Sequence, residues 1–254
     1  MTLEKILREK KKDKDILLMT HIVLGYPSFA ANREVIEQMV KNGVDCIEMQ
    51  IPFSEPMADG PVILKANQES LARGTRVAQC FDFAREMTRK HQIPFLFMTY
   101  YNIVFKYGEE RFFQDAKEAG IKGLIVPDLP PEMGEDYFAY AEQYQLAPII
   151  IYAPTSTPER MKTLAGSATG FIYCAARRGV TGNNSALDEN FDNYLSNCRA
   201  ATTLPLAVGF GIKSKADVQA LIGKADMAVI GSQTIRLVDE NGPKAVGPFV
   251  ASLR

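Results

Sequence analysis

The sequence contains no tryptophan and only two histidines, His21 and His91. Its four cysteines are far apart and form no CxxC pair, so neither a zinc site nor a disulfide framework is expected. Buried free thiols in a reducing compartment fit this spacing better. The cysteines are Cys46, Cys80, Cys174 and Cys198.

The chain also lacks an excess of charge and a long apolar run. It has 29 Lys and Arg against 30 Asp and Glu, a net charge of −1, with no dense basic patch. Nucleic acid is therefore not expected as a partner. The apolar segment 16–25 is interrupted by Thr20 and His21, and no run is long enough to span a membrane. These features predict a cytoplasmic protein with neither a nucleic-acid nor a membrane partner.

Short apolar runs alternate with amphipathic segments along the whole chain. Such alternation implies a parallel sheet with right-handed helical crossovers, and eight units in 254 residues fit a closed barrel. Neither GxGxxG nor GxxxxGK[ST] follows the first run, which disfavours a nucleotide-binding sheet. We predict an α/β fold, a single (β/α)₈ TIM barrel domain over residues 1–254 with an extra N-terminal helix at 3–12. The predicted strands are 16–24, 44–51, 93–100, 123–126, 147–152, 170–175, 204–208 and 227–230.

Two acids mark the second predicted strand and its loop. Glu48 interrupts the apolar run 44–51, where an unpaired buried carboxylate is costly, and Asp59 follows in a loop rich in proline. A buried strand with an acidic loop is how barrel enzymes present acid/base groups at the mouth of the core. Alternatively, Glu48 pairs with a structural Arg or Lys, and Asp59 only turns the loop.

Glycine turns follow the last three predicted strands. They are the segments 179–182, 208–212 and 230–232, the last ending in Ser232. Barrels often bind phosphate at this place through backbone N–H groups and a helix N-terminus, so the joint placement predicts a phosphate site. Ordinary turns are the alternative.

A polar loop and two tyrosines remain open from pattern alone. The loop 176–187 is predicted to be either a mobile lid that excludes water or an ordinary surface loop. Tyr100 and Tyr173 stand near the ends of the third and sixth predicted strands, where their hydroxyls reach a pocket or are satisfied locally.

At this point the motifs resemble a known family. IEMQIPFSEPMADGP resembles the signature of the tryptophan synthase alpha subunit, and the resemblance extends along essentially the whole chain through MTYYNIVFKYG, LIVPDLP, RRGVTG, GFGI and IGS. It implies a (β/α)₈ barrel, a lyase that cleaves indole-3-glycerol phosphate to indole and glyceraldehyde 3-phosphate. It also implies a beta-subunit partner in an alpha2beta2 complex, with pyridoxal phosphate in that partner and no cofactor in this chain.

The resemblance also implies roles for single residues. Glu48 corresponds to the general acid/base, and Asp59 to the carboxylate that accepts a hydrogen bond from the indole N–H. Tyr173 corresponds to the residue that orients Asp59, and Thr181 to the lid residue that contacts this aspartate. Tyr100 and His21 are further candidates for substrate binding. The residues that resemble the phosphate site are Gly182, Phe210, Gly211, Gly231 and Ser232.

Three positions depart from the family pattern. Tyr26 replaces the aspartate of a usual GDP, Glu55 replaces the aspartate of PFSDP, and His21 stands where a phenylalanine commonly lines the indole pocket. In the family, the two replaced acids lie in loops that communicate with the beta subunit and the lid.

Three functional hypotheses follow. The chain is a working lyase, an interaction subunit that activates a beta-type partner, or a barrel for another sugar phosphate. An aldolase that forms a Schiff base needs a lysine at a strand end. Lys41, Lys65 and Lys106 fall instead in predicted helices or loops, and the retained Glu48 and Asp59 favour the lyase.

Overall fold

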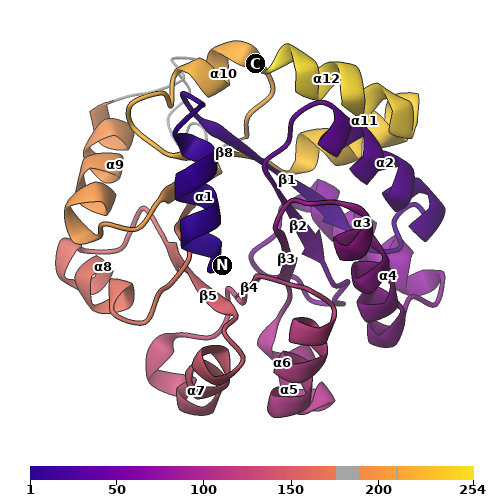
Figure 1. Ribbon diagram of the computed structural model, residues 1–254, viewed down its shortest axis with the longest axis horizontal. Helices are drawn as coiled ribbons and strands as arrows, with labels where there is room; N and C mark the ends of the chain where they lie inside the picture. The colour runs from indigo at the N-terminus through magenta and orange to yellow at the C-terminus, as the bar shows by residue number, and fades with distance from the viewer. Residues whose placement is uncertain (176–188, 210) are drawn as a thin grey trace.

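Eight parallel strands close into a barrel in the order in which they occur along the chain (Figure 1). The computed structural model describes residues 1–175, 189–209 and 211–254. Each strand pairs with its sequence neighbours, and β8 returns to β1, which confirms the predicted (β/α)₈ barrel. The strands are β1 (Leu17–Val23), β2 (Cys46–Gln50), β3 (Phe95–Met98), β4 (Gly123–Ile125), β5 (Ala147–Tyr152), β6 (Ile172–Ala175), β7 (Leu206–Gly209) and β8 (Met227–Ile230).

Helices surround the barrel (Figure 1). Several begin where the sequence provides a cap: the Ser28 hydroxyl accepts from the backbone of Ala31, and Thr157 accepts from Arg160. The helices are α1 (Leu3–Lys11), α2 (Phe29–Lys41), α3 (Pro61–Ala72), α4 (Val77–Lys90), α5 (Tyr101–Tyr107), α6 (Glu109–Glu118), η1 (Pro131–Met133), α7 (Glu135–Gln143), α8 (Pro158–Ala165), α9 (Glu189–Ala201), α10 (Lys215–Gln219), α11 (Ser232–Asn241), η2 (Pro243–Ala245) and α12 (Val246–Ser252). Within the described ranges, no helix is long and apolar enough to cross a membrane.

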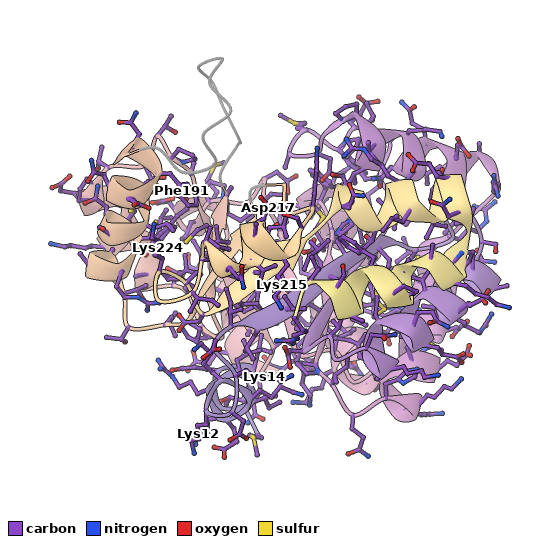
Figure 2. All side chains as sticks on the ribbon, turned by 90° about the horizontal axis from the view of Figure 1, so that it is seen from above. Lys12, Lys14, Phe191, Lys215, Asp217 and Lys224 are labelled. Atoms are coloured by element: carbon purple, nitrogen blue, oxygen red, sulfur yellow. The ribbon has the colours of Figure 1, made fainter. Side chains whose placement is uncertain are left out.

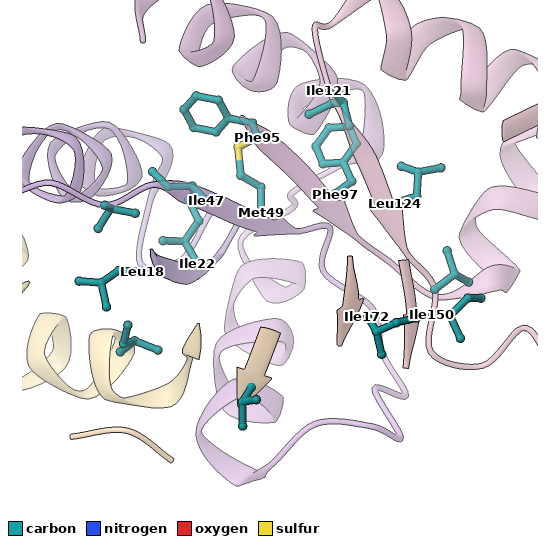
Figure 3. Close-up of a cluster of buried hydrophobic side chains, with 14 of the residues drawn as sticks. Leu18, Ile22, Ile47, Met49, Phe95, Phe97, Ile121, Leu124, Ile150 and Ile172 are labelled. Atoms are coloured by element: carbon teal, nitrogen blue, oxygen red, sulfur yellow. The ribbon is translucent and has the colours of Figure 1, made fainter. Parts of the chain in front are cut away.

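The strand side chains form two apolar layers because successive residues point to opposite faces. Leu18, Ile22 and Ile47 belong to the layer between the strands and the helices (Figure 3). Leu17 and Met19 belong to a second cluster, which fills the inside of the barrel. His21 continues the inward set of β1, and Glu48 stands beside it in the β1–β2 register.

Helix α1 closes the barrel at the amino ends of the strands. Its Leu3 and Leu7 are buried in the inner cluster. A Cβ added to Gly170, whose φ is +80°, would lie 2.9 Å from Leu3, so a glycine permits this close approach. The predicted N-terminal helix is thus part of the core, and a site can open only at the other end.

Asp45 anchors the same end electrostatically. Its buried carboxylate pairs with Lys14, which lies near α1 in Figure 2, and with Arg254 at 2.6 Å. It also accepts a hydrogen bond from the backbone of Leu18 at 3.0 Å. A buried carboxylate is tolerated when it is paired and hydrogen-bonded, so this cluster joins the chain's last residue to β1 and β2.

Candidate active site at the carboxyl ends of the strands

Glu48 and His21 form a buried pair at the carboxyl half of the barrel interior. His21 Nδ1 lies 2.9 Å from Glu48 Oε1, and the two side chains are 4% and 6% exposed. The β1–β2 register places the two residues side by side and both point inward. Among the described residues, the partner of Glu48 is a histidine and not the structural Arg or Lys of the alternative.

Asp59 enters the same region from the loop between β2 and α3. Its Oδ2 accepts a hydrogen bond from Gln50 Nε2 at 2.7 Å and another from the Tyr100 hydroxyl at 3.1 Å. The Tyr100 oxygen in turn accepts from the backbone of Ala58 at 3.0 Å. Asp59 therefore does more than turn the loop: Gln50 at the end of β2 and Tyr100, two residues after β3, hold its carboxylate at the barrel mouth.

Three inward-pointing side chains leave polar atoms without a partner here. His21 Nε2, Glu48 Oε2 and Gln50 Oε1 are buried and make no hydrogen bond within the described part of the chain. Each such atom costs about 1–3 kcal/mol when it is left unpaired. A cluster of three on neighbouring strands indicates a place built to receive a polar ligand.

Burial governs the protonation of this region. It raises the pKa of Asp59, against the opposing hydrogen bond from Gln50. Burial acts to lower the pKa of His21, but the charge and hydrogen bond of Glu48 outweigh it, so the pKa is raised above 6.5. Burial also raises the pKa of Tyr100 and of Tyr173, which keeps both hydroxyls protonated as donors.

Aromatic side chains line the apolar side of this region. Phe53 stacks on Tyr100 with ring centroids 5.0 Å apart, and Tyr173 on β6 packs against the inner cluster. A Cβ added to Gly209 would lie 2.8 Å from the Tyr173 hydroxyl, so the glycine at the end of β7 makes room for this ring. Flat apolar surfaces beside a few fixed polar groups suit a planar aromatic ligand.

The described part of the predicted phosphate site lies after β7 and β8. Gly211 follows β7 and Gly231 precedes Ser232, the first residue of α11. A Cβ added to either glycine would meet nothing within 4 Å, so both face open space. The free N–H groups and the dipole of a helix N-terminus favour an anion there. Thr181, Gly182 and Phe210 lie outside the described residues, as does the predicted lid.

The three residues that depart from the family pattern have different surroundings in the structure. Tyr26 is buried and donates a hydrogen bond to Asp239 of α11 at 2.7 Å, and Asp239 also pairs with Lys65 of α3 at 3.5 Å. Tyr26 thus joins two helices outside the barrel. Glu55 is exposed in the β2–α3 loop, and His21 contacts Glu48.

Sequence reasoning missed two participants. Gln50 holds Asp59, and Phe53 stacks on Tyr100, yet neither was predicted to take part. The signal for Gln50 was its spacing of two residues from Glu48 on a buried strand, which places both side chains on one face. Nothing in the sequence marked Phe53, because its partner is a residue far away in the chain.

A closed parallel barrel with buried carboxylates at the carboxyl ends of its strands defines a TIM-barrel enzyme. The family model described as "Tryptophan synthase alpha chain" matches residues 7–247. The chain belongs to the tryptophan synthase alpha chain family, and it is a lyase of tryptophan biosynthesis.

Relatives and solved structures agree with this assignment. The tryptophan synthase alpha chain of Desulforapulum autotrophicum is 56% identical over 251 residues, which cover 99% of each chain. Mycobacterium tuberculosis tryptophan synthase has a structure with TM-score 0.91 and 30% identity, covering 99% of this chain and 96% of that one. A tryptophan synthase complex from Pyrococcus furiosus matches with TM-score 0.85 and 26% identity, covering 93% and 97%.

Proposed function

We propose that this chain cleaves indole-3-glycerol phosphate to indole and glyceraldehyde 3-phosphate. The observation that carries the proposal is the presence of two carboxylates at one end of the barrel. Glu48, the acid/base candidate, has a buried Oε2 with no partner among the described residues, and Asp59 is held by Gln50 and Tyr100. A retro-aldol cleavage needs a proton donor at the leaving carbon and an electrostatic partner for the cation that forms.

Glu48 moves one proton in this reaction. Its carboxylate takes the proton from the hydroxyl on the carbon attached to the ring, and C3 of the indole receives a proton from the same group. The hydroxyl electrons form the aldehyde C=O, the carbon–carbon bond breaks, and its electron pair returns to the ring. Protons balance, because the one lost by the hydroxyl equals the one gained by C3.

Asp59 stabilises the ring while C3 carries the additional proton. Protonation at C3 places positive charge on the ring nitrogen, and a carboxylate that accepts the N–H hydrogen bond attracts this charge. Tyr100 supports this role by donating to Asp59, and Tyr173 and Phe53 provide the surface against which the ring lies. The chain needs no cofactor for these steps.

The phosphate group binds at Gly211, Gly231 and Ser232 in this proposal. The N-terminus of α11 supplies backbone donors and a favourable dipole, and the two glycines leave room for the phosphate. The resemblance assigns Gly182 and Phe210 to the same phosphate site and gives Thr181 a contact with Asp59, and all three lie outside the described residues.

We also propose a beta subunit as the partner, in an alpha2beta2 complex in the cytoplasm, with the pyridoxal phosphate in that partner. Three large apolar side chains are strongly exposed on segments that follow neighbouring strands β2, β3 and β4: Met57 (86%), Phe105 (64%) and Met133 (77%). Exposed apolar side chains gathered on one rim mark an interaction surface. The solved tryptophan synthase complex supports a beta subunit as its occupant.

The test is indole release from indole-3-glycerol phosphate by the purified chain, with and without its cognate beta subunit. Slow release that rises sharply with the partner is the expected result. Binding to the beta subunit without release in either condition would favour the interaction subunit. Release that ignores the partner would contradict the complex while leaving the lyase in place.

A further inference from the structure

His21 occupies a fixed position beside the proposed acid/base residue. Its backbone carbonyl accepts a hydrogen bond from the Thr234 hydroxyl at 3.0 Å, so α11 holds this part of β1. Its ring is almost fully buried, and Nδ1 lies 2.9 Å from Glu48 Oε1. The ring can neither turn freely nor exchange its partner for bulk water.

The two carboxylate oxygens of Glu48 differ in their hydrogen-bond partners. Of the two Glu48 oxygens, Oε1 is bound to His21 and Oε2 has no partner within the described residues. The other ring nitrogen of His21, Nε2, is also buried and unpaired. One oxygen is thus occupied by the imidazole, and the other remains available to a bound molecule.

The charged and titratable groups around the pair are mostly acidic or neutral. The charge of Asp59, from the β2–α3 loop, acts to raise the pKa of His21. Burial and the charges of Glu48 and Asp59 raise the pKa of Tyr173 of β6. Tyr100, at the start of α5, donates a hydrogen bond to Asp59. No Lys or Arg among the described residues forms an ion pair with Glu48, so its cationic partner is His21.

We infer that His21 is a positioning residue for Glu48, and that the two share one proton and work as a single acid/base unit. This inference rests on the proposed cleavage reaction. By binding Oε1, His21 fixes the carboxylate and makes Oε2 the oxygen that exchanges the proton with substrate.

The proton count is conserved through the cycle. With His21 protonated and Glu48 ionised, Oε2 accepts the proton of the substrate hydroxyl and gives it to C3 of the indole. The proton on Nδ1 stays between the two residues throughout. At the end of the reaction the pair holds the same single proton as at the start.

The first test compares His21→Asn with His21→Phe. Asparagine keeps an N–H donor near Nδ1 but does not titrate, whereas phenylalanine removes the donor. We expect His21→Phe to lower kcat by about tenfold to a hundredfold with a smaller change in KM, somewhat below the effect of removing an acid/base itself. His21→Asn should retain more of kcat. It should also lose the alkaline limb of the pH profile, the fall in activity as the pH rises through the pKa of His21.

His91→Asn is the matched control, because His91 ends α4 at the opposite end of the barrel. It should leave kcat, KM and the pH profile unchanged. Wild-type kcat together with a wild-type pH profile in His21→Phe would overturn the inference.

The second test does not need activity. Since the chain has only two histidines, His91→Asn leaves His21 as the single imidazole for an NMR titration. In that background His21 should titrate above its ordinary 6.5, and adding Glu48→Gln should lower its pKa, because burial remains while the charge of Glu48 is gone. An identical titration with and without Glu48→Gln would overturn the pairing. A Glu48-dependent titration in a chain that releases no indole would uphold the pairing and reject the proposed function.

Discussion

The hydroxyl of Tyr100 donates to Asp59 Oδ2 at 3.1 Å while it accepts from the backbone N–H of Ala58 at 3.0 Å. One side chain, two residues after β3, therefore fixes both the aspartate and the loop segment that carries it. The resemblance to the family assigned the orientation of Asp59 to Tyr173. In the described part of the chain, the hydroxyl bonded to Asp59 is that of Tyr100, and Tyr173 lies against Gly209.

Tyr100→Phe removes these two hydrogen bonds and keeps the ring that stacks on Phe53. We expect kcat/KM to fall by about tenfold, since the loss of one hydrogen bond to a charged group is worth about 1.5–3 kcal/mol. Steady-state kinetics of indole release measure the effect. The barrel should remain folded by circular dichroism, and an unchanged kcat/KM would show that the loop holds Asp59 without Tyr100.

Glu48→Gln should lower kcat by about 10²–10⁴-fold, because an amide cannot exchange a proton with the substrate. The side chain keeps its shape, so the barrel should fold. Glu55→Gln in the isolated chain is the matched control, since Glu55 is exposed in the following loop. Single-turnover kinetics separate the chemical step from binding, and wild-type turnover in Glu48→Gln would remove Glu48 from its role.

The acid limb of the pH profile should reflect Asp59. Burial raises the pKa of this carboxyl above its ordinary 3.8, and the carboxylate must be ionised to stabilise the ring cation. Activity is therefore present above the raised pKa and is lost as the pH falls through it, at a higher pH than for an exposed aspartate. The profile of kcat against pH measures this limb. Asp59→Asn should lower kcat and abolish the limb, and a limb that persists in that variant would assign it to another group.

Gly231→Ala tests the phosphate site. The new methyl meets no described protein atom within 4 Å, so the barrel should still fold. The methyl group would occupy the space proposed for the phosphate. We expect KM for the substrate and the inhibition constant of inorganic phosphate each to rise about tenfold. Gly166→Ala, between α8 and β6, should leave both constants alone, and unchanged phosphate inhibition in Gly231→Ala would place the anion elsewhere.

The exposed rim should contribute to binding of the beta subunit. Met57→Ser and Phe105→Ser should each weaken association by about tenfold, because truncating an apolar anchor at an interface costs more than about 1 kcal/mol. Ile222→Ser is the control, since Ile222 is also exposed but lies in the turn before β8, at the amino ends of the strands. Titration calorimetry with the cognate beta subunit gives the three affinities. Equal affinity for all three variants would move the interface away from this rim.

Much of the fold could be predicted from short apolar runs. Strands β5 and β8 have the predicted bounds, and β1 and β3 are one or two residues shorter than predicted at each end. Helix α5 was not predicted. Its segment 101–107 is rich in aromatic and β-branched residues, which favour a strand locally, yet it forms a helix after β3.

The site was less accessible to sequence reasoning. Glu48 was predicted because a carboxylate interrupts an apolar strand, and this pattern can be recognised in the sequence without knowing the fold. His21 was predicted only as a substrate contact, because its bond to Glu48 joins residues 27 positions apart and depends on the barrel register. Contacts between strands follow from closure of the sheet, and no local pattern carries that information.

The burial of Leu3 and Leu7 of α1 in the inner cluster has a kinetic consequence. Because these side chains fill the amino end of the barrel, Glu48 is reached from the carboxyl ends of the strands. Substrate enters, and both products leave, by the carboxyl ends of the strands. The products of one turnover must therefore be released before the next substrate binds. A partner bound at that rim would cover this route. Its motions would then control the rates of substrate entry and product release without contact with a reacting atom.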